Sequence, residues 1–123
     1  MKAKILLIED NEQNRYLATF LLEQDGHEVV HAATGREGIA MARDAAFAII
    51  VLDIQLPEID GYAVARALRA NPRLVAVPIV AVTSFAMVGD REKALAAGCN
   101  GYIEKPIDPE TFVKEITAFL HRP

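Results

Sequence analysis

The sequence predicts an α/β fold in which a parallel sheet of five strands is covered by helices on both faces. Five short apolar runs alternate along the chain with five stretches that carry apolar residues at helical spacing. The run from Ala48 to Asp53 has no polar alternation before its final carboxylate, which is typical of a strand buried on both faces of a parallel sheet. Strict alternation of strands and helices then gives a doubly wound sheet with right-handed crossovers.

The composition is that of one globular domain. Of the 123 residues, 52% are hydrophobic and 24% are charged, so the chain is long enough for one core but too short for two full domains. No apolar run approaches the roughly 18 residues of a membrane span, and the N-terminal segment lacks the apolar stretch of a signal peptide. We therefore expect a single domain over residues 1–123, located in the cytoplasm without membrane insertion.

Charge and cysteine content exclude further classes of site. The net charge of −4 and the 13 scattered basic residues argue against a nucleic-acid-binding face. Cys99 is the single cysteine, which excludes an internal disulfide and a cysteine-based zinc site. We expect Cys99 to be a small buried hydrophobe.

The first half of the chain supplies two strand–helix pairs. The expected strands are 4–8 and 28–32, and the expected helices run from about 12 to 24 and from about 35 to 44. Asp25-Gly26 is the stop signal of the first helix. Thr34 and Glu37 have the spacing of a capping box at the start of the second helix.

The third pair begins with the run that ends on Asp53. A loop punctuated by Pro57 and Gly61 follows this strand. A helix then carries Val64, Ala65 and Leu68 on one face, and Asn71-Pro72 closes it.

The last two pairs complete the alternation. The expected strands are 79–82, which ends on Thr83-Ser84, and 101–104, which ends at Lys105-Pro106. The helix between these strands is expected from about 87 to 97, with Gly98 as its cap. Asp108 and Pro109 are expected at the N-cap and the first position of the final helix.

Three carboxylates are expected to meet at one edge of this sheet. Five strands with this connectivity favour the flavodoxin-like order 2-1-3-4-5, which places the first and third strands side by side. Ligands of such sheets bind beyond the carboxyl ends of the strands. Glu9 and Asp10 follow the first strand and Asp53 ends the third, so their side chains should converge there.

Crowded carboxylates repel one another unless a cation neutralises them. Mg²⁺ prefers oxygen ligands in octahedral geometry, and Mn²⁺ accepts similar ones. Asp10 and Asp53 are candidates for direct ligation, and Glu9 for ligation either directly or through water. The backbone carbonyl of Gln55 is a candidate for a further ligand position.

Two more strand ends bring a hydroxyl and a cation to the same edge, from Thr83 and Lys105. A site that combines carboxylates, a metal ion, a hydroxyl and an ammonium suits phosphoryl transfer. This reaction requires that the phosphoryl group is positioned and that the charge on its oxygens is neutralised. Asp53, at the centre of the sheet, is the predicted nucleophile, and an aspartyl phosphate is the predicted product. Each residue taken alone also has an ordinary role, as a helix cap, a turn hydroxyl or a solvated charge, but their joint placement favours a site.

With these residues, the chain resembles the CheY-like receiver domains of two-component response regulators over essentially all 123 residues. The resemblance rests on an ordered set of motifs: Glu9-Asp10, Asp53, Pro57, Gly61, Thr83 and Lys105-Pro106. The runs 53–59 and 85–90 are also similar to DivK-type single-domain regulators.

The resemblance implies a phosphoprotein of a two-component phosphorelay. Asp53 would receive a phosphoryl group from a histidine kinase or a histidine phosphotransfer protein. Mg²⁺ would be held by Asp10, Asp53 and the carbonyl of Gln55, and Lys105 would pair with the phosphoryl oxygens. The Lys105-Pro106 peptide bond is expected to be cis.

The resemblance also implies a switch rather than an enzyme. Thr83 would move to the phosphoryl group and Tyr102 would turn inward, so that the surface of the fourth helix, fifth strand and fifth helix changes for a downstream protein. Gln55 and Phe85 stand at the two positions that tune phosphoryl lifetime, and Phe85 cannot orient an attacking water. We therefore expect slow self-dephosphorylation, and either a monomer or a phosphorylation-dependent dimer.

Three alternatives remain open. An aspartyl-nucleophile phosphatase would resemble this site, but its second acid is replaced here by Gln55. A flavin-binding electron carrier needs a first loop that attracts phosphate, whereas Glu9-Asp10 repels it. The chain also fits a receiver excised from a hybrid histidine kinase or larger regulator, although Met1 and the end at Pro123 favour a stand-alone regulator with no output domain.

Overall fold

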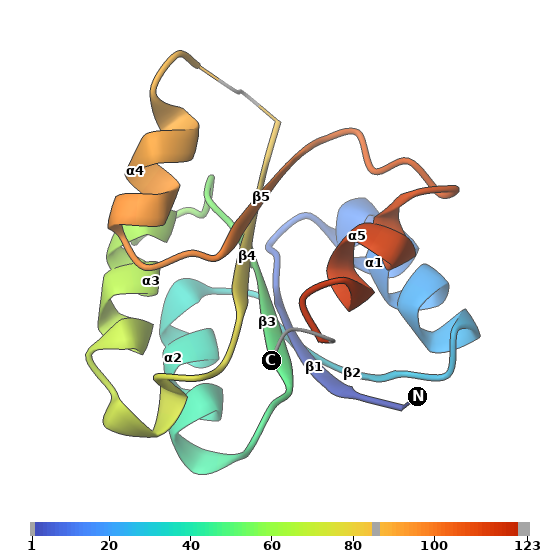
Figure 1. Cartoon of the computed structure of the whole chain (residues 1–123), viewed down its shortest axis with the longest axis horizontal. Helices are drawn as coiled ribbons and strands as arrows, with labels where there is room; N and C mark the ends of the chain where they lie inside the picture. Colours follow the sequence, from blue (N-terminus) through green and yellow to red (C-terminus); the bar gives the residue numbers. More distant parts are fainter. Residues whose placement is uncertain (1, 85–86, 121–123) are drawn as a thin grey trace.

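The computed structural model describes residues 2–84 and 87–120 and shows a parallel sheet between helical layers (Figure 1). The strands are β1 (Lys4–Ile8), β2 (Glu28–Ala32), β3 (Ile49–Asp53), β4 (Ile79–Thr83) and β5 (Gly101–Glu104). The helices are α1 (Glu12–Gln24), α2 (Gly35–Asp44), α3 (Gly61–Arg69), the 3₁₀ helix η1 (Pro72–Leu74), α4 (Asp90–Ala96) and α5 (Phe112–Thr117). The strand order is β2-β1-β3-β4-β5, so the predicted fold class and order are confirmed.

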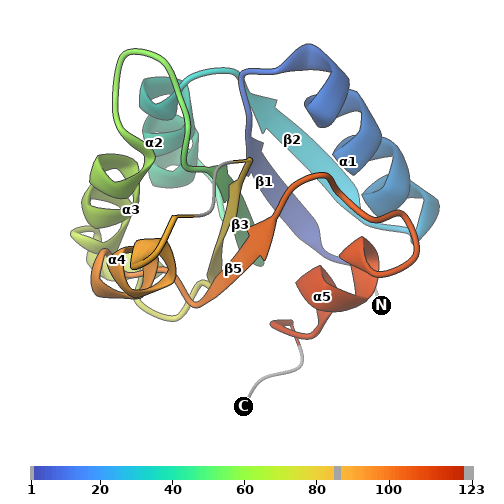
Figure 2. The ribbon, with the colours of Figure 1, turned by 90° about the horizontal axis from the view of Figure 1, so that it is seen from above.

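Two hydrophobic clusters fill the space between the sheet and its helices. α1 and α5 cover one face, and α2, α3 and α4 cover the other (Figure 2). In β3, Ile50 and Leu52 pack into the cluster that contains α2, α3 and α4, whereas Ile49 and Val51 pack into the other cluster. These four side chains are at most 1% exposed, which explains why the strand has no polar position before Asp53.

Side-chain caps fix the start of three helices beside the carboxyl edge of the sheet. The oxygens of Asn11, Thr34 and Asp60 accept hydrogen bonds of 2.9, 3.1 and 2.8 Å from N–H groups in the first turns of α1, α2 and α3. Each bond satisfies an N–H that has no partner inside the helix. The loops that lead from β1, β2 and β3 into their helices are therefore held in defined positions.

The loop after β3 closes tightly on the end of its strand. The N–H of Gly61 donates to the carbonyl of Ile54 at 3.1 Å. A Cβ atom at position 61 would overlap the Ile54 backbone, so glycine is needed for this close approach. The contact holds the residues that follow Asp53 against the sheet edge.

α4 begins later than the sequence predicts. The expected start near residue 87 is wrong, because the helix runs over Asp90–Ala96. Gly89 has a φ of 91°, which is outside the helical region. The side chain of Asp90 accepts a hydrogen bond from the N–H of Met87 at 2.7 Å. Met87 therefore belongs to the turn before the helix, while the expected cap Gly98 is confirmed by its φ of 110°.

α5 also begins later than predicted. Asp108 is not the N-cap of the regular helix, which runs over Phe112–Thr117. Asp108 instead starts a turn, in which its carboxylate accepts from the N–H of Glu110 and its carbonyl from the N–H of Phe112, both at 2.9 Å. Pro109 therefore lies in this turn rather than at the first position of the helix.

The structure bears on two expectations drawn from composition. Cys99 is 5% exposed, which confirms that it is a buried hydrophobe. Within residues 2–84 and 87–120, no helix has the length and hydropathy to cross a membrane.

Candidate functional site

The carboxyl edge of the sheet gathers the polar residues that the sequence singles out. Glu9 and Asp10 follow β1, Asp53 ends β3, Thr83 ends β4, and Lys105 follows β5. Glu9, Asp53 and Thr83 are 3–4% exposed, whereas Asp10 is exposed. A buried polar group requires partners, so this edge is a candidate site on burial alone.

The carboxylates form one cluster. Oxygen atoms of Glu9, Asp10 and Asp53 all lie within 4.8 Å of one another. The register explains this proximity, because Ile8 pairs with Leu52 and the residues that follow the pair are therefore adjacent. Three hard oxygen donors, one of them exposed to solvent, fit a partly hydrated Mg²⁺ or Mn²⁺.

Lys105 contacts two of these carboxylates. Its Nζ donates to Oε1 of Glu9 at 2.6 Å and lies 3.5 Å from Oδ2 of Asp53. The three side chains are 4–7% exposed, so water screens the pairs weakly. The structure thus places Lys105 next to the predicted acceptor, but its shorter bond is to Glu9.

Burial has the largest effect on the ionisation of Glu9. Burial, together with hydrogen bonding and repulsion from Asp53, raises the pKa of Glu9 to about 7, although Lys105 acts in the opposite direction. Oε2 of Glu9 also accepts a hydrogen bond from the N–H of Asn11 at 3.1 Å. A cation bound at the cluster would remove the repulsion and favour the charged form of this carboxyl.

Gln55 connects the acidic cluster to the neighbouring strand end. Its backbone N–H donates to Oδ1 of Asp53 at 2.9 Å, and its Oε1 accepts from the N–H of Ser84 at 2.9 Å. The sequence predicts a role for Gln55 as a metal ligand and in phosphoryl lifetime, but it does not indicate the bond to Ser84. The conformation of a side chain on a loop carries no signal in the residue pattern.

Tyr102 lies beside β4, where Ala81 is its partner in the register. Its ring packs against the core cluster on the face of α2, α3 and α4. Among the described residues, its hydroxyl is the buried side-chain group without a hydrogen-bond partner. The side chain is therefore half-buried with its hydroxyl turned away from solvent, and Phe85, which is predicted to tune phosphoryl lifetime, lies outside the described residues.

A small opening lies beside the cluster. It has a volume of about 280 Å³ and is lined by Asn14, Ser84, Lys105 and Pro106. The Lys105-Pro106 peptide bond at its border is cis. Lys105 lines this opening and contacts both Glu9 and Asp53, so the opening adjoins the acidic cluster.

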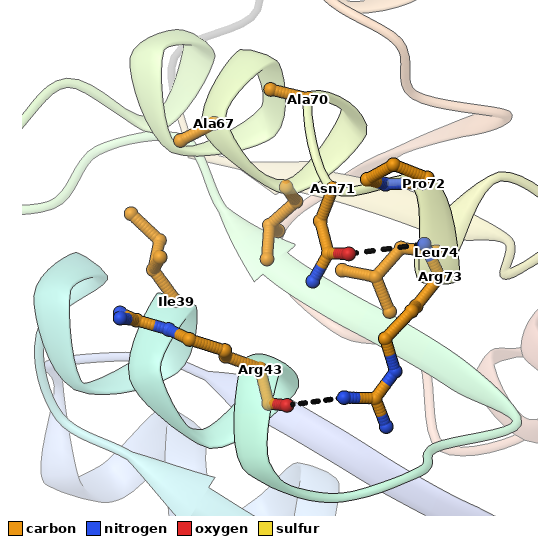
Figure 3. A pocket seen from close by; sticks show the side chains of 9 residues that line it. Ile39, Arg43, Ala67, Ala70, Asn71, Pro72, Arg73 and Leu74 are labelled. Carbon is orange, nitrogen blue, oxygen red and sulfur yellow. Dashed lines mark hydrogen bonds between the residues drawn. The ribbon is translucent and has the colours of Figure 1, made fainter.

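A groove of about 420 Å³ lies elsewhere, between the C-terminal ends of α2 and α3 (Figure 3). Arg43, Asn71 and Arg73 border its apolar floor, and Nη1 of Arg73 donates to the carbonyl of Arg43 at 3.1 Å. Both helices begin near the carboxyl edge of the sheet, so their C-terminal ends lie toward the opposite edge. The groove shares no lining residue with the acidic cluster.

The family model described as the response regulator receiver domain matches residues 5–117. The chain belongs to the response regulator receiver family. The matched range includes β1 from Ile5 onward, all of β2 to β5, and the residues of the acidic cluster. The resemblance based on the ordered motifs is therefore confirmed, and with it the assignment of this receiver to two-component signalling.

Relatives of the receiver match it over nearly their full length. The polar-differentiation response regulator DivK of Brucella ovis is 38% identical over 120 residues, which is 98% of each chain. The solved chemotaxis response regulator CheY4 of Vibrio cholerae is 30% identical, with a TM-score of 0.91 over 97% of this chain and 99% of that one. The similarity to DivK-type regulators is confirmed.

A third relative concerns the metal. The solved receiver domain of a sensor histidine kinase from Pseudomonas aeruginosa is 33% identical, with a TM-score of 0.91 over 99% of this chain and 100% of that one. That structure is described with a magnesium ion coordinated in its active site cleft. Receiver domains bind Mg²⁺ in an acidic pocket, and this receiver has the corresponding acidic cluster. These comparisons favour neither the phosphatase nor the flavin carrier.

Proposed function

We propose that Asp53 accepts a phosphoryl group from a histidine kinase or a histidine phosphotransfer protein, with Mg²⁺ or Mn²⁺ bound beside it. The observation that carries this proposal is the environment of its carboxylate. Asp53 is 4% exposed, clusters with Glu9 and Asp10, and lies 3.5 Å from Nζ of Lys105. A fixed carboxylate between a cation site and an ammonium meets the requirements of a phosphoryl acceptor.

Each residue has a part in the proposed transfer. Asp10, Asp53 and the carbonyl of Gln55 would hold the metal, with Glu9 contributing directly or through water; when bound, the metal neutralises the charge of the cluster and of the phosphoryl oxygens. An oxygen of Asp53 attacks phosphorus, and the bond from phosphorus to the histidine nitrogen of the donor breaks. Lys105 and the hydroxyl of Thr83 donate hydrogen bonds to the phosphoryl oxygens.

The proposed output is a change of surface rather than the turnover of a substrate. Movement of Thr83 toward the phosphoryl group would alter the packing of Tyr102. The buried hydroxyl of Tyr102, which has no hydrogen-bond partner among the described residues, could then form a hydrogen bond. Met87, Val88 and Leu95 are large, exposed apolar residues on or next to α4. They form the proposed contact surface for a downstream protein, together with β5 and α5.

Slow loss of the phosphoryl group is part of the proposal. The second residue past Asp53 is Gln55, which offers no acid or base to activate water. Phe85, two residues past Thr83, cannot orient water either. Phe85→Glu is therefore expected to shorten the lifetime of the phosphorylated protein, and an unchanged lifetime would refute this role.

Incubation with acetyl phosphate and Mg²⁺, followed by intact mass measurement, tests the proposal. The wild type is expected to gain a single phosphate, and Asp53→Asn none. Asp44→Asn removes an exposed carboxylate at the end of α2 and serves as the matched control, which should be phosphorylated like the wild type. Absence of an adduct with acetyl phosphate and with histidine kinases would overturn the proposal, and sustained hydrolysis of external phosphoesters that requires Asp53 would favour a phosphatase.

A further inference from the structure

Gln55 forms hydrogen bonds with its backbone and with its side chain at the same time. The backbone N–H donates to Oδ1 of Asp53, and the side-chain Oε1 accepts from the N–H of Ser84, each at 2.9 Å. β3 and β4 are neighbours, and Asp53 is the partner of Val82 in the register. Gln55 therefore ties the loop after the acceptor to the loop after Thr83.

Ser84 lines the opening that adjoins the acidic cluster. Ser84 directly follows the last residue of β4 and lines the same opening as Lys105. Lys105 in turn lies 3.5 Å from the carboxylate of Asp53. A backbone N–H in this place is a suitable donor to an anion above Asp53, because its direction is set by the strand that precedes it. In this structure the donor is occupied by the carboxamide of Gln55.

We propose that Gln55 is a positioning residue that caps the N–H of Ser84 until Asp53 carries a phosphoryl group, which then takes this N–H from Gln55. This proposal rests on the proposed function of Asp53. The exchange has a physical cause, since a hydrogen bond to a charged phosphoryl oxygen is about twice as strong as one to a neutral amide oxygen. Loss of the bond between Gln55 and Ser84 also releases the start of the segment that leads to α4.

The cap opposes the phosphorylated state, because its bond must break before the phosphoryl group gains the donor. A side chain at position 55 without an acceptor removes this cost and leaves the N–H of Ser84 to exchangeable water. We expect the affinity for a phosphoryl analogue to rise by about two- to tenfold, the range that corresponds to one neutral hydrogen bond.

Gln55→Met is the informative variant, because it keeps the length of the side chain and both backbone groups but removes the acceptor. Gln24→Met changes an exposed glutamine at the end of α1 and serves as the matched control. Calorimetric titration with beryllofluoride in saturating Mg²⁺ should show tighter binding to Gln55→Met and unchanged binding to Gln24→Met. Titration with Mg²⁺ alone measures the metal affinity of each protein separately, so that all three can be saturated with Mg²⁺ before beryllofluoride is added and the cap is separated from metal binding.

Amide hydrogen exchange at Ser84, followed by NMR, supplies a second readout. The Ser84 amide is expected to exchange slowly in the wild type and at least several-fold faster in Gln55→Met. Equal or weaker beryllofluoride binding by Gln55→Met, or unchanged exchange at Ser84, overturns the cap while the function of Asp53 stands. Failure of the wild type to bind beryllofluoride, in contrast, overturns the proposed function and the cap together.

Discussion

Glu9 is the residue of the site at which burial and charge oppose each other most directly. It is 4% exposed and lies within a cluster of three carboxylates, and its nearest cation is Nζ of Lys105 at 2.6 Å. Folding without metal therefore favours the protonated form of Glu9, as its raised pKa indicates. A bound cation would therefore offset the repulsion among the three carboxylates, which the metal-free site retains.

The stability of the metal-free protein relative to Glu9→Gln is predicted to depend on pH. The pKa of Glu9 is raised from 4.5 to about 7 in the folded protein. The favourable contribution of the Glu9 carboxyl to the free energy of unfolding is therefore fully present below pH 4.5 and is lost as the pH rises through 7. The free energy of unfolding of the wild type should fall relative to the variant by on the order of 2 kcal/mol across this window. Urea unfolding in chelator at a series of pH values measures it, and a constant difference contradicts the account.

Replacement of Lys105 is predicted to tighten metal binding. Nζ of Lys105 lies within 3.5 Å of both Glu9 and Asp53, so it repels a divalent cation placed among the same oxygens. Lys105→Met should raise the affinity for Mg²⁺ by about three- to tenfold at low salt. Calorimetric titration measures the affinity, with Lys114→Met, on the exposed side of α5, as the control. Unchanged or weaker binding of Mg²⁺ by Lys105→Met would show that the Lys105 ammonium does not oppose the binding of a cation at the cluster.

At the residue scale, the sequence predicts which side chains meet but not how they bond. Glu9, Asp53 and Lys105 are predictable because each lies at or directly after the end of a strand, and parallel strand ends share one edge. The bond between Gln55 and Ser84 depends on the conformation of one loop side chain, so no pattern of residue types reports it.

Among the elements, α3 is held by a single arginine at its C-terminal end. Nε of Arg69 donates to the carbonyl of Gly98 at 2.8 Å, and Nη1 donates to that of Leu74 at 2.6 Å. Nη2 donates to Oδ1 of Asn100, which also accepts from the N–H of Ile79 at 2.9 Å. Arg69 therefore joins α3, η1, the end of α4 and the start of β4.

Arg69→Leu is predicted to lower the free energy of unfolding by about 2–4 kcal/mol, because the carbonyls of Gly98 and Leu74, both in partly buried bonds, lose a charged donor together. Arg66→Leu is the matched control on the same helix, since Arg66 is exposed, and it should change stability by no more than about 0.5 kcal/mol. Urea unfolding monitored by circular dichroism measures both variants. Similar stabilities for the two would disprove the structural role of Arg69.

The starts of α4 and α5 show where local sequence signals mislead. Met87 and Val88 extend the apolar pattern of α4, but Gly89 breaks the helical path in front of Asp90. Asp108 is a strong capping signal, yet its oxygens close a turn before α5. α1 and α2 match their predicted ranges, because Asn11 and Thr34 cap them directly.

At the scale of the whole molecule, the topology is the most predictable property. Strand–helix alternation limits the sheet to a few right-handed arrangements, and the count of five strands, with the most apolar runs at the centre, favours one order among them. The order β2-β1-β3-β4-β5 then brings the ends of β1, β3 and β5 to one edge without any long-range signal in the sequence.

Mg²⁺ is predicted to stabilise the whole domain, because it binds a cluster that only the folded chain assembles. A concentration of 100 times the dissociation constant should add about 2.7 kcal/mol to the free energy of unfolding. Asp10→Asn removes the exposed carboxylate of the cluster and should reduce this gain at the same concentration, whereas Asp44→Asn should not. Chemical unfolding with and without Mg²⁺ measures the gain, and equal stabilisation of the three proteins would place the ion elsewhere.

The central claim is that Asp53 is the residue that accepts the phosphoryl group, and reductive trapping tests it most directly. Borohydride reduces an aspartyl phosphate to homoserine, so the site of modification can be read by peptide mass spectrometry after incubation with a phosphodonor and Mg²⁺. The account predicts this conversion at position 53, and no conversion in protein kept without phosphodonor. Conversion at Asp10 or at another carboxylate, with position 53 unchanged, would contradict it.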